Sequence, residues 1–419
     1  MSRYLYIVTL VVAGEMVFSL PFHIARFFRP TMLEVFSFTN TQLGDLFAVY
    51  GVTAMLSYFP GGAIADRYSA RFLLTASLVS TAAGGFYLAT IPTPFNMALL
   101  YGYWGVTTVF LLWGALIRAT RDWGGESSQG KAFGILESGR GVTAAVVAGI
   151  LVMVLASYMP EDASLASDEA RRRGFQMVVL GYSLIALLAG VMAWFAIPDI
   201  DDVSVSRPNP FRNMLLVIGR PIVWAQAAVI ICAYCGYKSL DYFSLYAVQV
   251  LGMDEVEGAR LASYGAYVRP VAALAAGLIA DRFSATRSIG VIFAVMALVF
   301  AVLSMLTPAS TSLVIIYLTI GVSLFAVFSL RGVYFALLQE SRTPRYITGA
   351  AVGLISLVGY TPDIFMAPVA GRILDSTPGA GGFVHLFWLL TGIAVVGIAV
   401  IAVLLRLQRN NSLDEPVSC

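Results

Sequence analysis

The chain has 419 residues, of which 59% are hydrophobic and 12% are charged. Soluble domains carry about 25% charged residues, so this composition excludes an ordinary globular fold and predicts a polytopic helical membrane protein. The net charge of +2 gives no reason to expect nucleic acid as a partner. Three cysteines are too few for a disulfide framework.

Apolar runs of about 20 residues, each long enough to cross the hydrocarbon core of a bilayer, follow one another along the chain. We expect an all-α protein with twelve transmembrane helices, six in each half. In chain order they cover residues 4–26, 42–65, 71–91, 96–118, 132–157, 174–197, 221–247, 257–280, 287–306, 311–338, 347–374 and 382–405.

The predicted helices divide the chain into four parts. An N-terminal six-helix half covers residues 1–197, and a linker rich in Asp, Pro and Arg follows at 198–220. The C-terminal six-helix half covers 221–406, before a short tail at 407–419. Arginine and lysine concentrate in the loops on the side of the N-terminus, which predicts that both termini, the linker and the tail are cytoplasmic.

A short motif in the loop after the second span returns in the second half of the chain. The string GGAIADRY at residues 61–68 is matched by AAGLIADRF at 275–283, and Asp66 is equivalent to Asp281. The offset, 281 − 66 = 215, is about half of the chain length. Internal repeats in a membrane protein are typical of transporters whose two halves move about a central site.

The repeated motif is similar to a known signature. The run Gly62-x-x-x-Asp66-Arg67-x-Ser69-x-Arg71 resembles the cytoplasmic loop that marks the major facilitator superfamily, and a weaker copy contains Gly277, Asp281 and Arg282. The resemblance covers the whole chain and implies the fold of that family, a twelve-helix secondary transporter that works by alternating access. Serines at 69 and 284 stand where the family usually has glycine.

The resemblance also implies a gating role for the motif. Asp66 would face the start of the eleventh span near Gly349, and Asp281 would face the start of the fifth span near Gly134. A carboxylate at the positive end of a helix is stabilised by about 0.3–2 kcal/mol, so these contacts would hold the cytoplasmic side closed. The glycines would allow a neighbouring helix to approach closely. The alternative is a topological anchor, in which the arginines only keep a short loop inside.

Two further segments, GKAFGILESGRG at 130–141 and VGYTPDIF at 358–365, look similar to branches of the superfamily related to organic-anion carriers. The match names no substrate. The fifth span lacks the Gly-Pro signature typical of the superfamily's drug/proton antiporters.

Charged residues inside predicted spans cost at least about 2.5–3.5 kcal/mol to insert, so each is a candidate functional residue. Arg140 and Arg269 fall nearest the middle of the membrane, and Arg269 has no acidic residue within reach on its own helix. The fifth and eighth helices meet in the fold that the resemblance implies, so two guanidiniums could grip one anionic substrate. Glu137 and Arg331 complete the predicted binding set. Glu137 and Arg140 are also i,i+3, and a plain intrahelical ion pair is the alternative.

Two carboxyl groups are candidate proton carriers. Glu15 lies about twelve residues into the first helix, where burial favours a neutral carboxyl. Its alternative role is a structural pairing with Arg269, Arg331 or a tyrosine hydroxyl. Asp363 on the eleventh span is the second candidate, beside Pro362. His23 is interpreted as an interfacial residue rather than a proton relay.

These features predict a secondary active transporter for a small organic anion (carboxylate, sugar acid, phosphate or sulfonate), coupled to proton symport. No phosphate-binding loop is present, which argues against ATP-driven transport. No nucleophile–base or metal-ligand pattern predicts an enzyme, a metal or a cofactor. The expected setting is the inner (plasma) membrane, and the expected state is a monomer. The alternatives are an exporter of drugs or metabolites by proton antiport and, from another class, a non-transporting membrane sensor.

Overall fold

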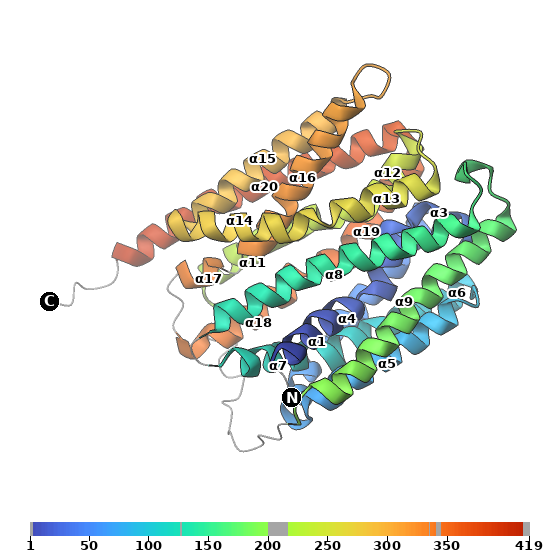
Figure 1. Cartoon of the computed structure of the whole chain (residues 1–419). Coiled ribbons are helices and arrows are strands. Elements are labelled where there is room, and N and C mark those ends of the chain that lie inside the picture. Colours follow the sequence, from blue (N-terminus) through green and yellow to red (C-terminus); the bar gives the residue numbers. More distant parts are fainter. Residues whose placement is uncertain (1–2, 126–127, 200–216, 335, 341–344, 414–419) are drawn as a thin grey trace. The chain divides into compact units, whose positions relative to one another are not determined.

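The computed structural model describes residues 3–125, 128–199, 217–334, 336–340 and 345–413. Within them every regular element is a helix, and no strand occurs (Figure 1). The predicted linker at 198–220 lies largely outside the described residues, and so does the end of the predicted tail at 407–419.

The chain packs into two compact units. Unit 1 comprises Met1–Val205, Leu240–Pro270 and Asp363–Gly382, and unit 2 comprises Ser206–Ser239, Val271–Pro362 and Phe383–Cys419. The predicted division into two six-helix halves stays a prediction.

Unit 1 is built from both long helices and short helical pieces. Its elements up to residue 196 are α1 (Arg3–Met16), η1 (Ser19–His23), α2 (Ile24–Phe27), α3 (Arg29–Phe36), α4 (Asn40–Arg67), α5 (Ala70–Leu88), α6 (Pro94–Gly105), η2 (Val106–Trp113), α7 (Gly114–Gly124), α8 (Gln129–Tyr158), η3 (Ala163–Leu165) and α9 (Asp168–Ala196). Its later elements are α12 (Phe243–Gln249), α13 (Glu255–Gly265), most of α19 (Pro362–Ser376) and the first residues of α14 (Val268–Arg282).

Unit 2 contains most of α14 and five further helices. These helices are α11 (Pro221–Lys238), α15 (Ala285–Met305), α16 (Leu313–Val333), α17 (Ala336–Glu340) and α18 (Arg345–Gly359). It also contains most of α20 (Ala380–Leu413). The short segment η4 (Ser239–Tyr242) contains the point in the chain where unit 2 passes into unit 1. Inside unit 2, α15 packs against α16, and α11 packs against α16 and α18.

Every predicted span coincides with one helix or with consecutive helices. Among the described residues, eight helical stretches are long and apolar enough to cross a membrane. A ninth is counted if the bent pair Arg3–Met16 and Ser19–Phe27 forms one span. The other three predicted spans, 42–65, 71–91 and 257–280, are also helical, in α4, α5 and α13–α14.

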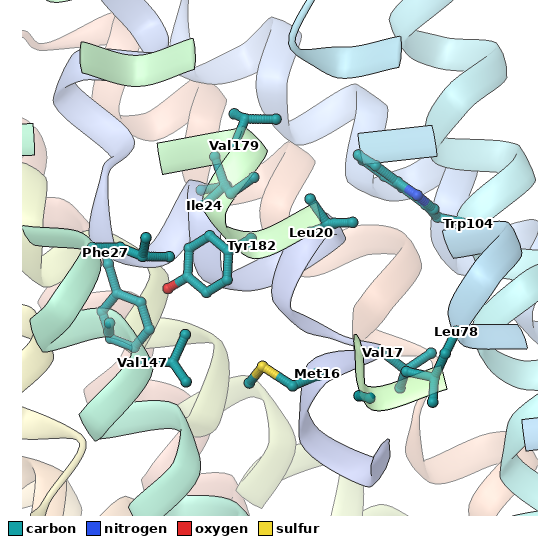
Figure 2. Close-up of a cluster of buried hydrophobic side chains, with 14 of the residues drawn as sticks. Met16, Val17, Leu20, Ile24, Phe27, Leu78, Trp104, Val147, Val179 and Tyr182 are labelled. Atoms are coloured by element: carbon teal, nitrogen blue, oxygen red, sulfur yellow. The ribbon is translucent and has the colours of Figure 1, made fainter. Parts of the chain in front are cut away.

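The interior of unit 1 is a continuous set of buried apolar side chains. Helices α1, α8 and α9 run side by side in Figure 1, and α5 packs along α9. Figure 2 shows part of this core, where Leu20, Leu78, Trp104 and Tyr182 meet from different helices. The indole N–H of Trp104 donates to the carbonyl of Thr81 at 3.1 Å, which satisfies its one polar atom in an apolar setting. This core fixes the helices that carry the polar residues described below.

A seam of glycines joins α4 to α19 in unit 1. A Cβ on Gly44 would come within 2.5 Å of the carbonyl oxygen of Ala367, and one on Gly51 within 2.7 Å of the backbone of Asp363. A Cβ on Gly371 would likewise collide with the carbonyl oxygen of Asn40. Small residues let two membrane helices touch backbone to backbone, so these three positions set the separation of α4 and α19.

Candidate functional site

The first span is broken between Glu15 and His23. Helix α1 ends at Met16, and the π-helical segment η1 follows with a bend of 41° between the two parts. Pro21 lies in this segment and has no N–H to donate, and the hydroxyl of Ser19 donates to the carbonyl of Met16 at 2.6 Å. The break brings His23 back toward Glu15, with Nε2 lying 3.3 Å from Oε1.

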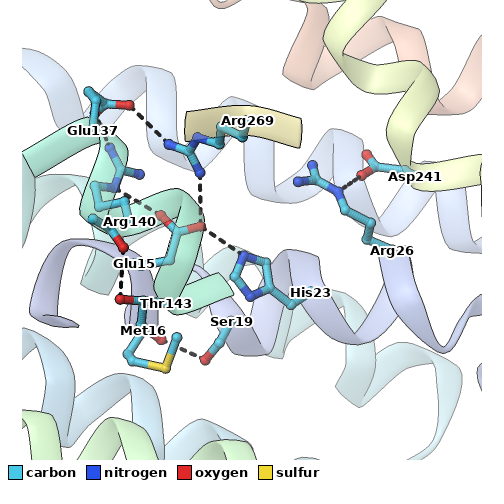
Figure 3. A network of polar contacts seen from close by, with 11 residues as sticks. Glu15, Met16, Ser19, His23, Arg26, Glu137, Arg140, Thr143, Asp241 and Arg269 are labelled. Carbon is cyan, nitrogen blue, oxygen red and sulfur yellow. Dashed lines mark hydrogen bonds and ion pairs between the residues drawn. The ribbon is translucent and has the colours of Figure 1, made fainter. Parts of the chain in front are cut away.

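Glu15 is the centre of a buried polar network (Figure 3). Its Oε2 accepts a hydrogen bond from Nε of Arg140 on α8 at 2.9 Å. Its Oε1 accepts one from Nη1 of Arg269 on α14 at 3.1 Å. All three residues, together with His23, are at most 6% exposed. A carboxylate at this depth is tolerated because cations and hydrogen-bond donors surround it.

Glu137 binds the same two arginines from the other side. Its Oε1 accepts from Nη1 of Arg140 at 2.6 Å, and its Oε2 accepts from Nη2 of Arg269 at 2.9 Å. The four side chains therefore form a closed ring in which each arginine bonds to both glutamates. With all four ionised, the two positive and two negative charges cancel.

Two local features let Arg269 reach α8. Helix α13 ends at Gly265, and α14 starts after a break in which the N–H of Arg269 donates to the carbonyl of Ala266 at 3.2 Å. A Cβ on Gly141 of α8 would lie 3.1 Å from both Cδ of Arg269 and Cδ of Pro270. The absence of a side chain at Gly141 therefore leaves room for the arginine to lie along α8.

The structure brings four of the predicted site residues together, namely Glu15, Glu137, Arg140 and Arg269. It also contains both of the alternative contacts, because Glu15 pairs with Arg269 and Glu137 pairs with Arg140 along one helix. His23, interpreted from the sequence as interfacial, is instead buried beside Glu15. That interpretation was wrong, because the π-helical break turns the imidazole inward.

The other two predicted site residues, Asp363 and Arg331, are not among the four side chains of the ring. Asp363 is near the start of α19, with its backbone against Gly51 of α4. Arg331 is in unit 2, where its guanidinium carbon lies 4.2 Å from the ring centroid of Tyr237 and 5.8 Å from that of Tyr234. Arginine over tyrosine at these distances is a cation–π contact.

The gating motif is described only in part. The side chains of Asp66 and Asp281 are outside the described ones, so the predicted latch stays a prediction. Arg67 and Arg282 are exposed, and Arg71 donates through Nε to the carbonyl of Ile197 at 2.8 Å.

A close helix approach is present at Gly61, the residue before Gly62. Among the described atoms, nothing comes within 4 Å of a Cβ built on Gly62 or on Gly277. A Cβ on the preceding Gly61 would instead lie 3.0 Å from the carbonyl oxygen of Phe110. The expectation of a close helix approach at Gly62 and Gly277 therefore stays a prediction.

Arg118 holds the loop after the second span in a way that the sequence did not suggest. Its guanidinium donates to the carbonyl of Ala65 and, at 2.9 Å, to the carbonyl of Tyr68. These acceptors belong to the last turn of α4 and its end, where carbonyls have no partner within the helix. Arg118 thus caps α4 at the motif.

A second buried ion pair, between Arg26 and Asp241, was not predicted from the sequence. Nε of Arg26 lies 2.7 Å from Oδ1 of Asp241, and both residues are at most 9% exposed. The two positions are 215 apart, which is the offset of the repeated motif. In a fold whose halves are related by a two-fold axis, a contact between equivalent positions lies at that axis. Applying the offset to oppositely charged residues would have found this pair.

Three further polar contacts within unit 1 tie elements from the two halves of the chain. The carboxylate of Asp375 accepts from the N–H groups of Asn40 and Thr41 at 3.1 and 2.7 Å, which caps the start of α4. Glu255 accepts from the hydroxyl of Thr31 at 2.7 Å and from Arg171 at 2.6 Å, and Arg372 bonds to Asp45 at 2.9 Å.

Comparison with known proteins places this arrangement in a family. The chain is 27% identical over 426 residues to the inner membrane protein YqcE of Escherichia coli, covering 99% of this chain and 96% of YqcE. It is 25% identical over 353 residues to the probable nitrate/nitrite antiporter NarK1 of Thermus thermophilus, covering 80% and 77% of the two chains. It is 20% identical over 375 residues to the glycerol-3-phosphate transporter of Bacillus subtilis, covering 84% and 82%.

The fold has solved counterparts as well. A bacterial homologue of the human lysosomal transporter Spinster, solved in an inward-facing and unoccupied conformation, aligns with a TM-score of 0.73. The two chains are 14% identical, and the alignment covers 97% of this chain and 96% of that one. The family model described as the Major Facilitator Superfamily matches residues 11–365. The chain therefore belongs to the Major Facilitator Superfamily, as the duplicated loop motif predicted, and has its twelve-helix fold.

Proposed function

We propose that this transporter moves a small organic anion by alternating access, coupled to proton symport. The observation that supports this most directly is the convergence of Arg140 and Arg269, from two different helices, on one buried network. Paired guanidiniums offer several N–H donors in fixed geometry and suit a carboxylate, phosphate or sulfonate group. In this proposal the two arginines bind the anionic group of the substrate.

The names of two relatives agree with an anionic cargo. NarK1 is named for nitrate and nitrite, and the Bacillus protein for glycerol 3-phosphate. All three compounds are oxyanions, although they differ in size and charge. The carboxylates of the ring give a reason for proton coupling, because an entering anion competes with them for the arginines and a proton can neutralise the one that is released. Glu15 and Asp363 remain the predicted proton sites, and Arg331 a predicted part of the binding set.

The proposed setting follows from the family and the charge distribution. The protein is a multi-pass membrane protein, and YqcE is named as an inner membrane protein. Both termini are proposed to lie in the cytoplasm, because most arginines in short loops fall on that side. Asp66 and Asp281 are proposed to gate the cytoplasmic side, and the protein to act as a monomer.

The test is uptake by the purified protein in proteoliposomes with an inward proton gradient. Labelled small carboxylates, sugar acids, sulfonates and phosphates form the substrate panel. Arg269→Ala should reduce the initial rate by about 30-fold or more, because a buried charge partner is lost. Arg173→Ala is the matched control, since the side chain of Arg173 is 66% exposed and pairs with Glu169 one turn away on the same helix.

Two results would count against this proposal. Normal uptake by a correctly folded Arg269→Ala variant would reject the anion site, with folding checked by size-exclusion chromatography and thermal unfolding. Arg269→Lys guards against a folding failure, because it keeps the charge and loses the two-pronged geometry. If the alanine variant does not fold and Arg269→Lys transports normally, the proposed role of the Arg269 guanidinium is likewise rejected.

A second candidate is an exporter that works by proton antiport. The name of NarK1, an antiporter, is the observation that favours it. An exporter predicts that cells lacking the gene accumulate more of the substrate than wild-type cells do. A proton symporter for uptake predicts less accumulation in the same strain.

A further inference from the structure

The two carboxylates of the ring differ sharply in their access to solvent. The side chain of Glu15 is 4% exposed, and those of Arg140 and Arg269 are 4% and 8% exposed. The side chain of Glu137 is 41% exposed. One of two chemically equivalent ligands of the same arginine pair is therefore enclosed, and the other faces outward from the ring.

The enclosed carboxylate also lies beside an imidazole. Glu15 bonds to both arginines, and His23 lies 3.3 Å from its Oε1. Glu137 bonds to the same arginines, with one oxygen to Nη1 of Arg140 and the other to Nη2 of Arg269. Of the two carboxylates, Glu137 is therefore the one more open to an entering anion.

We propose that Glu137 is an internal substitute for the carboxylate of the substrate and carries the coupling proton. The two oxygens of Glu137 occupy the positions, against Nη1 of Arg140 and Nη2 of Arg269, that the two oxygens of the cargo take after Glu137 swings away. This inference rests on the proposed anion transport, and it moves the coupling role from Glu15 and Asp363 to Glu137.

The charges of the exchange balance. One carboxylate leaves the arginines and another replaces it, so the ring stays neutral. The released Glu137 has lost both cations, and one proton from the aqueous side bonds to its carboxylate oxygen and neutralises it. One monovalent anion and one proton are then bound together. Because binding free energies are reciprocal, a proton on Glu137 strengthens anion binding by the same factor as the anion strengthens proton binding.

Loss of that proton on the other side of the membrane reverses the exchange. Ionised Glu137 returns to the arginines and displaces the cargo. The same charge balance predicts the substrate class. A carboxylate or a sulfonate is monovalent and can place two oxygens against the arginines, so it replaces Glu137 without residual charge. A doubly charged phosphate would leave one negative charge uncompensated in a buried ring.

The charged and titratable groups around Glu137 come from four helical elements. Arg140 lies one turn along the same helix, and Arg269 comes from α14. Glu15 on α1 and His23 on η1 lie behind the two guanidiniums, on the enclosed side of the ring. Protonation of Glu137 therefore weakens two ion pairs at the accessible side, while the enclosed pairs to Glu15 are kept.

The first test removes the proposed substitute and supplies it from solution. In purified full-length Glu137→Ala, sodium formate should raise the midpoint of thermal unfolding by about 2 °C or more above the effect of equimolar sodium chloride. The matched control is Glu15→Ala, in which the missing carboxylate was enclosed, and formate should act there no more than chloride does. No formate-specific rise in Glu137→Ala, or an equal rise in both variants, would overturn the proposal.

The second test keeps the proposal falsifiable if the alanine variants do not fold. Formate should stabilise the wild-type protein more at about pH 5.5 than at about pH 7.5, because a protonated Glu137 dissociates from the two arginines more readily than an ionised one. Glu137→Gln, which cannot ionise, should be stabilised equally at the two pH values. A wild-type response that is the same at both pH values would reject the role of Glu137.

These outcomes are distinct from those of the transport assay. If Arg269→Ala loses uptake but Glu137→Ala shows no formate response, the anion-transport proposal stands and the exchange at Glu137 is rejected. If formate stabilises only Glu137→Ala while Arg269→Ala transports normally, the ring binds carboxylates but is not the transport site.

Discussion

Glu15 and Arg269 are 254 positions apart in the chain, and their side chains meet at 3.1 Å inside one helical unit. The contact joins the first predicted span to the eighth, and it exists only because both spans are interrupted nearby, at η1 and at the break before Arg269. A continuous helix at either place would aim the side chain differently, since direction along a helix is fixed by its period. Irregular backbone here serves to assemble the charged ring.

The ring predicts a strong dependence of stability on charge balance. Glu15→Gln should lower the free energy of unfolding by about 3–5 kcal/mol, because two buried arginines are left with one carboxylate between them. The double variant Glu15→Gln/Arg269→Gln restores a neutral Glu137–Arg140 pair, so its loss should be smaller than the sum of the two single losses. Thermal unfolding of the purified protein in detergent measures all three, and strictly additive losses would contradict the ring.

The pair of Arg26 and Asp241 predicts that its two charges are interchangeable. Arg26→Gln and Asp241→Asn should each destabilise the protein by about 3 kcal/mol, since each leaves a buried charge without its main partner. The exchange Arg26→Asp/Asp241→Arg should recover most of this loss, because equivalent positions about a two-fold axis present similar surroundings. The same thermal measurement decides it. An exchanged protein as unstable as the single variants would show that the surroundings of the two positions differ.

The glycine seam between α4 and α19 predicts a third effect on stability. Gly44→Ala and Gly371→Ala should each cost about 1–3 kcal/mol, because the added methyl group meets backbone that cannot move aside cheaply. Gly149→Ala on α8 is the matched control, since no described atom lies within 4 Å of its Cβ position. Alanine is the better helix former, so that variant should gain up to about 1 kcal/mol. Equal effects at all three glycines would remove the seam as a packing feature.

Apolar runs and the breaks between them predicted the twelve spans, all of which are helical, because a membrane helix must satisfy its own backbone in lipid. Membership of the superfamily confirms that the chain is a transporter and not an enzyme. What hydropathy could not locate were the breaks within spans. Pro21 is visible in the sequence, yet the span at 4–26 was expected to be one helix, because proline is tolerated in membrane helices when neighbours satisfy the freed groups.

The charged residues were predictable as a set, and the contacts Glu15–Arg269 and Glu137–Arg140 were among the alternatives, but the closed ring was not predicted. Arg269 has no acidic residue within reach on its own helix, which required a partner from another helix. That the partners are Glu15 and Glu137 together depends on the close passage at Gly141, a single missing side chain among 38 glycines. The cap that Asp375 gives to α4 was likewise hidden, because it uses main-chain donors that every sequence supplies.

The ion pair of Arg26 and Asp241 has a consequence for what a duplicated chain can do. A symmetric dimer of two identical half-length chains would set residue 26 against its own copy, arginine against arginine, because an interface across a two-fold axis pairs each residue with itself at the axis. Opposite charges can meet there only when the two copies are covalently joined and have become different. A homodimer of the repeat therefore cannot form an ion pair at this position.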